Sequence, residues 1–267
     1  MNPRTNPFSR LHQPPRQVQC ETHGAYLASP LLNDRWTGCP TCSQDEIAQQ
    51  EARETALKAS EEAARWNAKL EDFGIPLRFQ DRTLETYVCQ SLGQERALAF
   101  ATDYAQNFAR ALAKGTSCVF VGKPGTGKTH LAVGIALHIM REGRTVRYAT
   151  VQRAVRRIKD TWHRESKERE SDALRSMTEV DFLILDEIGV QFGSDFEKNL
   201  LFEVLNARYE NRRPSVILSN LNQQEVQGYL GERVVDRIRE DGGRVITFDW
   251  ASHRRQGSSQ NGSGAGA

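Results

Sequence analysis

A glycine-rich segment at 122–129 has the residue types of a loop that binds phosphate. Its sequence, GKPGTGKT, fits the pattern G-x-x-x-x-G-K-[ST]. The glycines let successive backbone N–H groups turn inward around phosphate oxygens, while Lys128 would neutralise the β- and γ-phosphates and Thr129 would ligate Mg²⁺. The segment therefore predicts a site for ATP or ADP formed by Gly122, Lys123, Pro124, Gly125, Thr126, Gly127, Lys128 and Thr129.

Two adjacent acidic residues, Asp186 and Glu187, follow a largely apolar run at 180–185. An enzyme with such a phosphate loop needs a carboxylate near the metal, at the C-terminal end of a neighbouring strand. Asp186 is predicted to hold Mg²⁺ through a water molecule, and Glu187 to orient and deprotonate the water that attacks the γ-phosphate. The alternative is that the two acids only mark the end of an ordinary strand.

Asn220 follows an expected strand at 215–218. If this strand lies beside the acidic one, the amide of Asn220 can position the attacking water. Ser219 is an alternative polar group for this role, and simple capping of the loop by Asn220 is a second alternative.

Arg233 and Arg237 lie four residues apart, on one face of an expected short helix. An arginine from a neighbouring subunit can stabilise the phosphoryl group during transfer, which would make hydrolysis depend on self-assembly through the ATP sites. The alternative is a solvated helix face on which the arginines pair with Glu232 and Asp236.

Two closely spaced ligand pairs, Cys20 with His23 and Cys39 with Cys42, are separated by fifteen residues. Each pair can form one knuckle of a tetrahedral Zn²⁺ site. Four ligands leave no open position, so the predicted metal is structural and clamps a segment that has few large apolar residues. The alternative is free cysteines beside an uninvolved histidine.

A basic stretch at 151–164 contains Asp160 as its one acidic residue. A positive helix with an aromatic side chain suits single-stranded DNA, because phosphates are neutralised and bases stack. The alternative is a solvated basic face with the tryptophan in the core. The predicted DNA contacts are Arg153, Arg156, Arg157, Lys159 and Trp162, with Arg164 nearby.

These groups require an α/β fold. Apolar patterning predicts strands at 117–121, 145–148, 180–185, 215–218 and 245–248, and helices at 94–113, 129–141, 151–162 and 194–209. The last helix carries a Ser194 to Glu197 capping box. Strands that alternate with helices imply a parallel sheet flanked by helices.

Composition narrows the class of protein. The 267 residues include 36 basic and 34 acidic ones, a net charge of +2, which excludes a polycation of the histone type. No stretch approaches the ~18 apolar residues of a membrane span, and residues 1–17 lack the apolar run of a signal peptide. A cytoplasmic protein without membrane contact is therefore predicted, and its five cysteines are too few for a disulfide framework.

The predicted organisation has five parts. A disordered N-terminus at 1–18 precedes a zinc finger at 19–44, a connecting helix at 45–72, an ATPase domain at 73–250 and a flexible tail at 251–267. The helix at 45–72 has few large apolar residues, so it either bridges the two domains or binds a partner.

The segments GKPGTGKTH, LILDEIGVQ, VILSN and GERVVDRIR resemble the AAA+ replicative helicase loaders of the DnaC type, including versions encoded by phages. The similarity spans about 73–250. It implies a protein that binds a hexameric replicative helicase and delivers it to single-stranded DNA under ATP control. The resemblance also makes Asn220 the polar sensor and Arg237 the arginine that acts on the next subunit, so the predicted catalytic set is Glu187, Lys128, Asn220 and Arg237.

Two departures from the family affect this expectation. About thirteen residues separate Arg237 from Trp250, too few for the helical lid of fuller AAA+ proteins, which implies a weak ATPase. A metal module also replaces the helical helicase-binding region of the best-known loaders. Another branch of helicase loaders has an N-terminal zinc fold that grips the helicase, and this resemblance implies that the module binds the helicase. Contact with nucleic acid is the alternative, which is less favoured because Arg16 and Arg35 are opposed by Glu21 and Asp34. The rival functions are a transposition helper ATPase and a zinc-dependent DNA-binding regulator that senses ATP.

Overall fold

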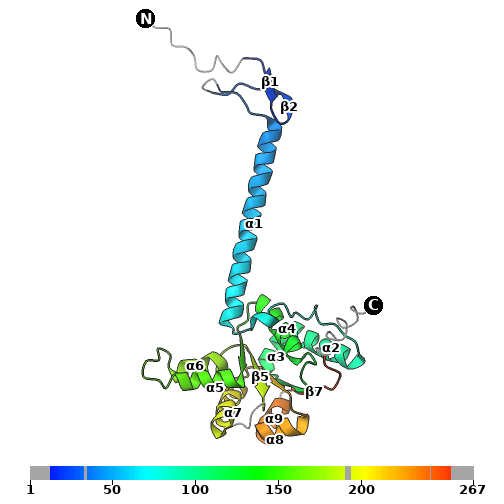
Figure 1. Ribbon diagram of the computed structural model, residues 1–267, viewed down its shortest axis with the longest axis vertical. Coiled ribbons are helices and arrows are strands. Elements are labelled where there is room, and N and C mark those ends of the chain that lie inside the picture. The colour runs from blue at the N-terminus through cyan, green and yellow to red at the C-terminus, as the bar shows by residue number, and fades with distance from the viewer. Residues whose placement is uncertain (1–12, 33–34, 190–193, 241, 254–267) are drawn as a thin grey trace, which may run out of the picture. The chain divides into compact units, whose positions relative to one another are not determined.

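The computed structural model describes residues 13–32, 35–189, 194–240 and 242–253 (Figure 1). The chain divides into two compact units, Met1–Asn67 and Ala68–Ala267. Most of the predicted N-terminal disorder at 1–18 and of the predicted tail at 251–267 lies outside the described residues. Residues 16–18 are an exception, because they belong to the first strand, β1.

The N-terminal unit begins with an antiparallel hairpin of β1 (Arg16–Cys20) and β2 (Gly24–Ala28), paired from Arg16 with Ala28 to Cys20 with Gly24. The guanidinium carbon of Arg16 lies 4.1 Å from the ring centroid of Trp36. Of the described apolar residues before α1, only Ala28 and Cys39 are buried. So small an apolar core favours a fold that a metal ion stabilises.

Helix α1 (Pro40–Asp72) starts five residues earlier than predicted and therefore includes Cys42. Proline is favoured at the first helical position because its missing N–H needs no partner there. Of the residues of α1, all of which are described, only Leu70 is buried. Apart from Leu70, the side chains of this helix are therefore not buried. None of the described helices combines the length and the apolar character needed to cross a bilayer.

The second unit is built on a parallel sheet in the order β4-β5-β6-β3-β7. Its strands are β3 (Cys118–Gly122), β4 (Val146–Thr150), β5 (Phe182–Ile188), β6 (Ser215–Ser219) and β7 (Arg244–Phe248). The predicted parallel α/β fold is confirmed. The acidic strand β5 was expected to be a direct neighbour of the phosphate-loop strand β3. The structure differs, because β6 lies between these two strands. The end of β6 is thereby placed between the two motifs.

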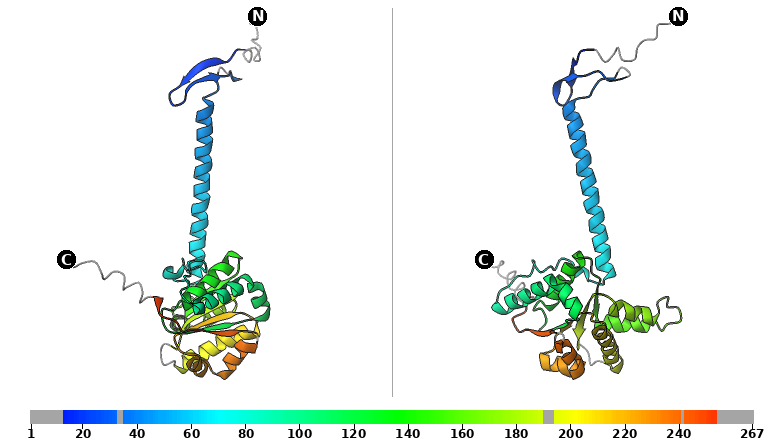
Figure 2. Two further views of the ribbon diagram at one scale, coloured as in Figure 1. Left: turned by 90° about the vertical axis from the view of Figure 1, so that its right-hand side faces the viewer. Right: turned by 180° about the vertical axis from the view of Figure 1, so that it is seen from behind.

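Helices cover both faces of this sheet, so its central strands β3, β5 and β6 are largely buried on both sides (Figure 2). On one side lie α2 (Leu92–Gln106), α3 (Phe108–Lys114) and α4 (Lys128–Arg141). On the other lie α5 (Val151–Asp160), α6 (Glu170–Thr178), α7 (Asp195–Glu210), α8 (Gln223–Leu230) and α9 (Glu232–Glu240). A short 3-10 turn, η3 (Leu77–Phe79), precedes α2.

Several predicted boundaries differ from the structure. The helix expected at 94–113 is broken at Asn107 into α2 and α3, and α6 and α8 were not predicted. Strand β5 starts at Phe182, two residues later than predicted, and Asp181 just before it forms an ion pair with Arg213. The capping box of α7 is only half formed: Ser194 accepts from the Glu197 N–H, but the Glu197 carboxylate accepts from a tyrosine hydroxyl of α8.

Arg208 of α7 fixes the N-terminal ends of β5 and β6. Its side chain is buried, and its Nε donates to Ser215 Oγ over 2.8 Å. Its terminal nitrogens donate to the carbonyls of Met177, Thr178, Val180 and Pro214. Burial lowers the pKa of Arg208 to about 9. The planar guanidinium suits this fan of acceptors and holds in place the strands whose opposite ends carry the site.

Candidate nucleotide and metal sites

Glycine is required at two positions of the phosphate loop, which connects β3 to α4. Gly122 has φ +133°, and a Cβ there would lie 2.2 Å from the carbonyl oxygen of Phe248. Gly127 has φ +95°, and a Cβ there would lie 2.6 Å from the ring of Tyr87. Both positions combine a left-handed backbone with close neighbours, which only glycine tolerates.

Lys128 is held at the inner side of the loop. Its Nζ donates to the carbonyl oxygens of Gly122 (2.7 Å) and Lys123 (2.9 Å) and to Asn220 Oδ1 (3.0 Å). The residue is only 6% exposed. The structure thus brings together the predicted lysine and the predicted polar sensor, which are 92 residues apart in sequence.

Asp186 lies next to Thr129. Its Oδ2 accepts from the Thr129 hydroxyl over 3.0 Å and from the Tyr148 hydroxyl over 2.7 Å. A carboxylate beside a hydroxyl at the start of α4 is an oxygen donor set that suits Mg²⁺. Tyr148 was not predicted, because nothing in its local sequence indicates its distant partner.

A β-bulge makes the side chains of Asp186 and Glu187 point in different directions. The β5–β6 ladder is regular to Leu185 and resumes at Ile188, so two residues of β5 face one of β6. Glu187 has φ +63° and an exposed side chain, while Asp186 is 9% exposed. The Glu187 N–H donates to Asp186 Oδ1 over 2.7 Å. The bulge leaves one acid buried beside Thr129 and the other open to solvent, a device common next to active sites.

The alternatives for Asn220 are not supported by its surroundings. Ser219 is buried and donates to the Ile188 carbonyl over 2.7 Å, so it ties β6 to β5. The residue that caps the following helix is Asn222, whose side chain forms a capping box with Glu225. Asn220 remains the polar group at the end of β6 that contacts Lys128.

Residues outside the predicted motifs support the outer side of the loop. The Thr126 carbonyl accepts from Tyr87 Oη (3.3 Å) and from Trp250 Nε1 (2.9 Å). The His253 N–H donates to the Gly125 carbonyl over 3.0 Å, so the start of the predicted tail is bound to the loop. Burial raises the pKa of Tyr87 to about 12, so its hydroxyl stays a donor.

Arg237 and Arg233 both lie on α9. Arg237 Nη1 donates to Asn206 Oδ1, and its guanidinium carbon lies 4.7 Å from the ring centroid of Tyr209. Arg233 is exposed. These contacts belong to α7 and not to the phosphate loop of the same chain.

The predicted DNA residues differ in what they contact. Arg153, Arg156 and Lys159 are exposed on α5. Arg157 instead forms an ion pair with Glu168, with its Nε 3.1 Å from Oε2, and donates to a serine of α6. Trp162 is 56% exposed, which argues against the alternative that it is a core residue. Its ring contacts Phe196, and its Nε1 donates to Glu170 over 2.7 Å.

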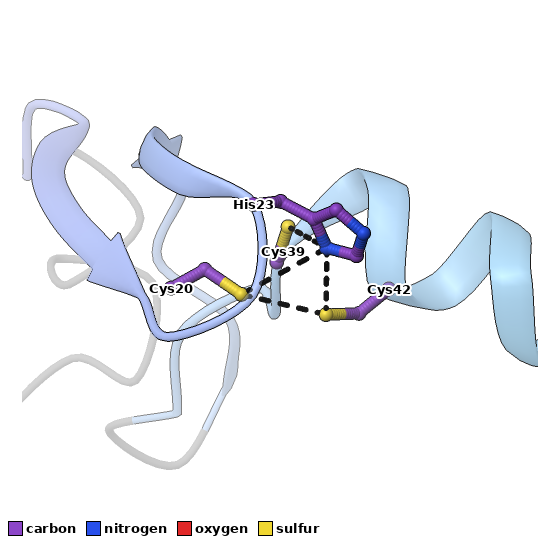
Figure 3. Close-up of side chains that lie close together, drawn as sticks. All are labelled: Cys20, His23, Cys39 and Cys42. Atoms are coloured by element: carbon purple, nitrogen blue, oxygen red, sulfur yellow. Dashed lines mark hydrogen bonds between the residues drawn. The ribbon is translucent and has the colours of Figure 1, made fainter.

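Cys20, His23, Cys39 and Cys42 converge in the N-terminal unit (Figure 3). Their ligand atoms all lie within 4.8 Å of one another. His23 Nδ1 is 3.3 Å from the Cys42 sulfur, and the Cys20 sulfur is 3.5 Å from that of Cys42. Backbone hydrogen bonds lower the pKa of Cys20 to about 6, whereas the contact with Cys20 raises the pKa of Cys42 to about 12, so without a metal the pair shares one proton. Three sulfurs and one nitrogen at this spacing can hold a single metal ion.

Asp45 completes the surroundings of His23. Its Oδ2 lies 3.0 Å from His23 Nε2, the ring nitrogen opposite the cluster. Asp45 lies three residues after Cys42 on α1, so both face the same side of the helix. Sequence reasoning missed this carboxylate, although its spacing from a ligand cysteine could have indicated it.

Comparison with known proteins gives consistent results. Residues 80–260 match the family described as IstB-like ATP binding protein. The replicative helicase loader DnaC of Escherichia coli K12 is 36% identical over 202 residues, which cover 76% of this chain and 81% of that protein. The DnaC of Buchnera aphidicola subsp. Baizongia pistaciae is 34% identical over 183 residues, covering 68% and 73%.

Two solved structures share the fold of this chain. The crystal structure of a DnaC helicase loader superposes with a TM-score of 0.57 and 27% identity, covering 65% of this chain and 99% of that one. AMPPCP-bound DnaA from Aquifex aeolicus shares the fold, with a TM-score of 0.54, 19% identity and coverage of 70% and 55%. The chain belongs to the AAA+ family of IstB-like ATP-binding proteins and DnaC replicative helicase loaders.

Proposed function

We propose that this protein loads a hexameric replicative helicase onto single-stranded DNA under the control of ATP. The observation that carries the proposal is the meeting of Lys128, Asn220 and the Thr129–Asp186 pair at one end of the sheet, in a chain related to DnaC loaders over three quarters of its length. The rival functions, a transposition helper and a DNA-binding regulator, have less support because the relatives at 34–36% identity are replicative helicase loaders.

The residues of the site divide the work of ATP hydrolysis. Lys128 binds phosphate charge, and Thr129 and Asp186 would hold Mg²⁺, which supplies electrostatic stabilisation of the phosphates when bound. Glu187, exposed beside them, accepts the proton of the attacking water, and Asn220 orients that water. Because Arg237 has its contacts on α7, full turnover needs an arginine from a neighbouring copy, and an isolated chain is a weak ATPase.

The N-terminal cluster is proposed to bind one structural Zn²⁺. Thiolates and imidazole are the ligands that zinc prefers, and four of them leave no position for a substrate. The hydrogen bond from His23 Nε2 to Asp45 fixes the tautomer in which Nδ1 faces the three sulfurs. The small buried core of the hairpin makes the metal a condition of its folding.

Replacing Asp45 by asparagine should weaken zinc binding by about 10- to 100-fold, because the carboxylate orients His23 and raises its basicity. Zinc affinity is measured by competition with a chromogenic chelator. Glu46→Gln is the matched control, since Glu46 is the neighbouring exposed acid on α1. Equal zinc affinity in the Asp45 variant and the wild type would show that the contact has no role in the metal site.

The hairpin is proposed to dock on the helicase and not on DNA. The exposed large apolar side chains in and just after the hairpin are Leu27, Leu31 and Leu32. Arg16, a cation that could contact phosphates, is stacked on Trp36. Exposed leucines without excess positive charge suit a protein surface better than a polyanion.

Single-stranded DNA is proposed to follow α5. Arg153, Arg156 and Lys159 are exposed there, and Trp162 offers an accessible ring for base stacking. Arg157 contributes less than expected because Glu168 neutralises it.

The proposed function is tested by measuring capture of the hexameric replicative helicase of the same cell by the full-length protein, with and without ATP. Transfer of the captured helicase to circular single-stranded DNA is followed by sedimentation. Capture and ATP-dependent transfer are expected. Binding to a transposase, or sequence-specific binding to duplex DNA without helicase capture, would instead favour one of the rivals.

A double variant separates DNA delivery from helicase binding in the same assay. The double variant Arg153→Ala with Arg156→Ala should still capture helicase but transfer less of it to DNA. The slope of log K for DNA binding against log salt concentration should become shallower by about 0.7 for each lost phosphate contact. Arg110→Ala with Lys114→Ala removes two exposed cations from α3 and serves as the control.

A further inference from the structure

The Asp186 carboxylate is oriented by three hydrogen bonds. Oδ1 accepts from the Glu187 N–H, and Oδ2 accepts from the hydroxyls of Thr129 and Tyr148 at 3.0 and 2.7 Å. Two of the donors belong to the motifs that bind and hydrolyse nucleotide. Tyr148 belongs to neither, because it lies on β4, at the edge of the sheet.

The register of β4 and β5 explains this contact. Thr150 lies opposite Asp186 and Tyr148 opposite Ile184, so Tyr148 is the diagonal neighbour of Asp186 on the same face. A diagonal neighbour is within reach of a long aromatic side chain. The Tyr148 side chain is buried, and its hydroxyl donates to Asp186 Oδ2 over 2.7 Å.

The backbone of Tyr148 is fixed from both sides. One edge of β4 pairs with β5, and on the other edge the Tyr148 N–H donates to the Phe73 carbonyl over 2.8 Å. Gly74, with φ +77°, permits this approach, since a Cβ there would lie 2.6 Å from the Tyr148 carbonyl oxygen. The Asp72 carbonyl accepts from Arg147 Nη1 over 2.5 Å and anchors the same segment.

We propose that Tyr148 is a positioning residue that holds the Asp186 carboxylate in the orientation required for Mg²⁺. The proposal rests on the nucleotide and Mg²⁺ role proposed above for this site. Thr129 must direct an oxygen lone pair to the metal, whereas Tyr148 has no such second task. Its hydrogen bond therefore keeps Asp186 in place with or without the metal.

The test is the binding of a fluorescent ADP analogue to the full-length protein, titrated with Mg²⁺ and repeated in EDTA. Tyr148→Phe keeps the buried ring and removes only the hydroxyl. This variant should bind the ADP analogue in EDTA as the wild type does. The Mg²⁺ concentration that gives half of the Mg²⁺-dependent increase in analogue binding should rise by about 10-fold, as expected for loss of a group that orients a metal ligand. Mn²⁺ bound in the presence of ADP, measured by electron paramagnetic resonance, should weaken by a similar factor.

Tyr104→Phe is the matched control. The Tyr104 hydroxyl is also buried and donates to the Thr116 carbonyl over 2.6 Å, on α2 and away from the acids. It should leave the Mg²⁺ requirement unchanged. A wild-type requirement in Tyr148→Phe, or an equal shift in Tyr104→Phe, would overturn the proposal. Failure of the wild type to bind the analogue at all would instead count against the proposed function.

Discussion

Replacing Lys128 by alanine should abolish detectable ATP binding, whereas Glu187→Gln should bind ATP as the wild type does and lose hydrolysis. The lysine ammonium is held at the phosphate loop by two loop carbonyls and Asn220, so its removal takes away the charge that phosphate binding requires. The Glu187 side chain is exposed, and the hydrogen bond of this residue to Asp186 is made by its backbone N–H. Its glutamine variant keeps the shape of the side chain and loses the base, which costs about 10²- to 10⁴-fold in rate.

A fluorescent ATP analogue measures binding, and phosphate release in the presence of helicase and single-stranded DNA measures hydrolysis. Glu203→Gln is a suitable control, because Glu203 is an exposed acid on α7. If both variants lose binding to the same extent, the division of roles between lysine and glutamate is wrong.

Arg237→Ala should bind ATP normally but hydrolyse it about 10³- to 10⁵-fold more slowly once subunits assemble, the range attributed to an arginine supplied by a neighbour. In the single chain Arg237 donates to Asn206 and stacks on Tyr209, so its side chain is held on the α7–α9 surface and not at the phosphate loop of its own chain. Arg239→Ala, on the same helix and paired with Asp236, is the control.

A mixing experiment distinguishes a role between subunits from a role within one. Lys128→Ala chains cannot bind ATP but retain Arg237, so adding them to Arg237→Ala chains should restore part of the phosphate release. A mixture as inactive as its components, under conditions where wild-type chains assemble, would exclude Arg237 and leave Arg233 as the next candidate.

The parallel α/β fold could be predicted because each strand is an apolar run and the phosphate loop fixes the strand before it and the helix after it. The same local patterns identified Lys128, Asp186 and Asn220, which the fold then brings together. Several predicted boundaries differ from the structure by a few residues. Strand β5, for example, starts two residues later than predicted, and Asp181 just before it pairs with Arg213.

The remaining features of the site depend on tertiary contacts that local patterns do not encode. Tyr148 on β4 donates a hydrogen bond to Asp186 on the neighbouring strand β5. Trp250 donates one to Thr126 of the phosphate loop, 124 residues earlier in the sequence. Arg157 looked like its neighbours in sequence, yet Glu168 pairs with it. The bulge at Glu187 is equally hidden from sequence reasoning, because the one extra residue of β5 opposite β6 arises only once the sheet forms.

The backbone conformation at Glu187 lowers the folding free energy that the protein could gain there, while the side chain at this position is proposed to serve ATP hydrolysis. At φ +63° a side chain costs roughly 1 kcal/mol relative to glycine, the residue that this conformation favours. The fold alone would therefore favour glycine at 187, whereas the proposed role as the base requires glutamate there. On that proposal, a variant that needs ATP binding but no hydrolysis would gain folding free energy by replacing Glu187 with glycine. The residue at this one position would then separate a protein that hydrolyses ATP from one that merely binds it.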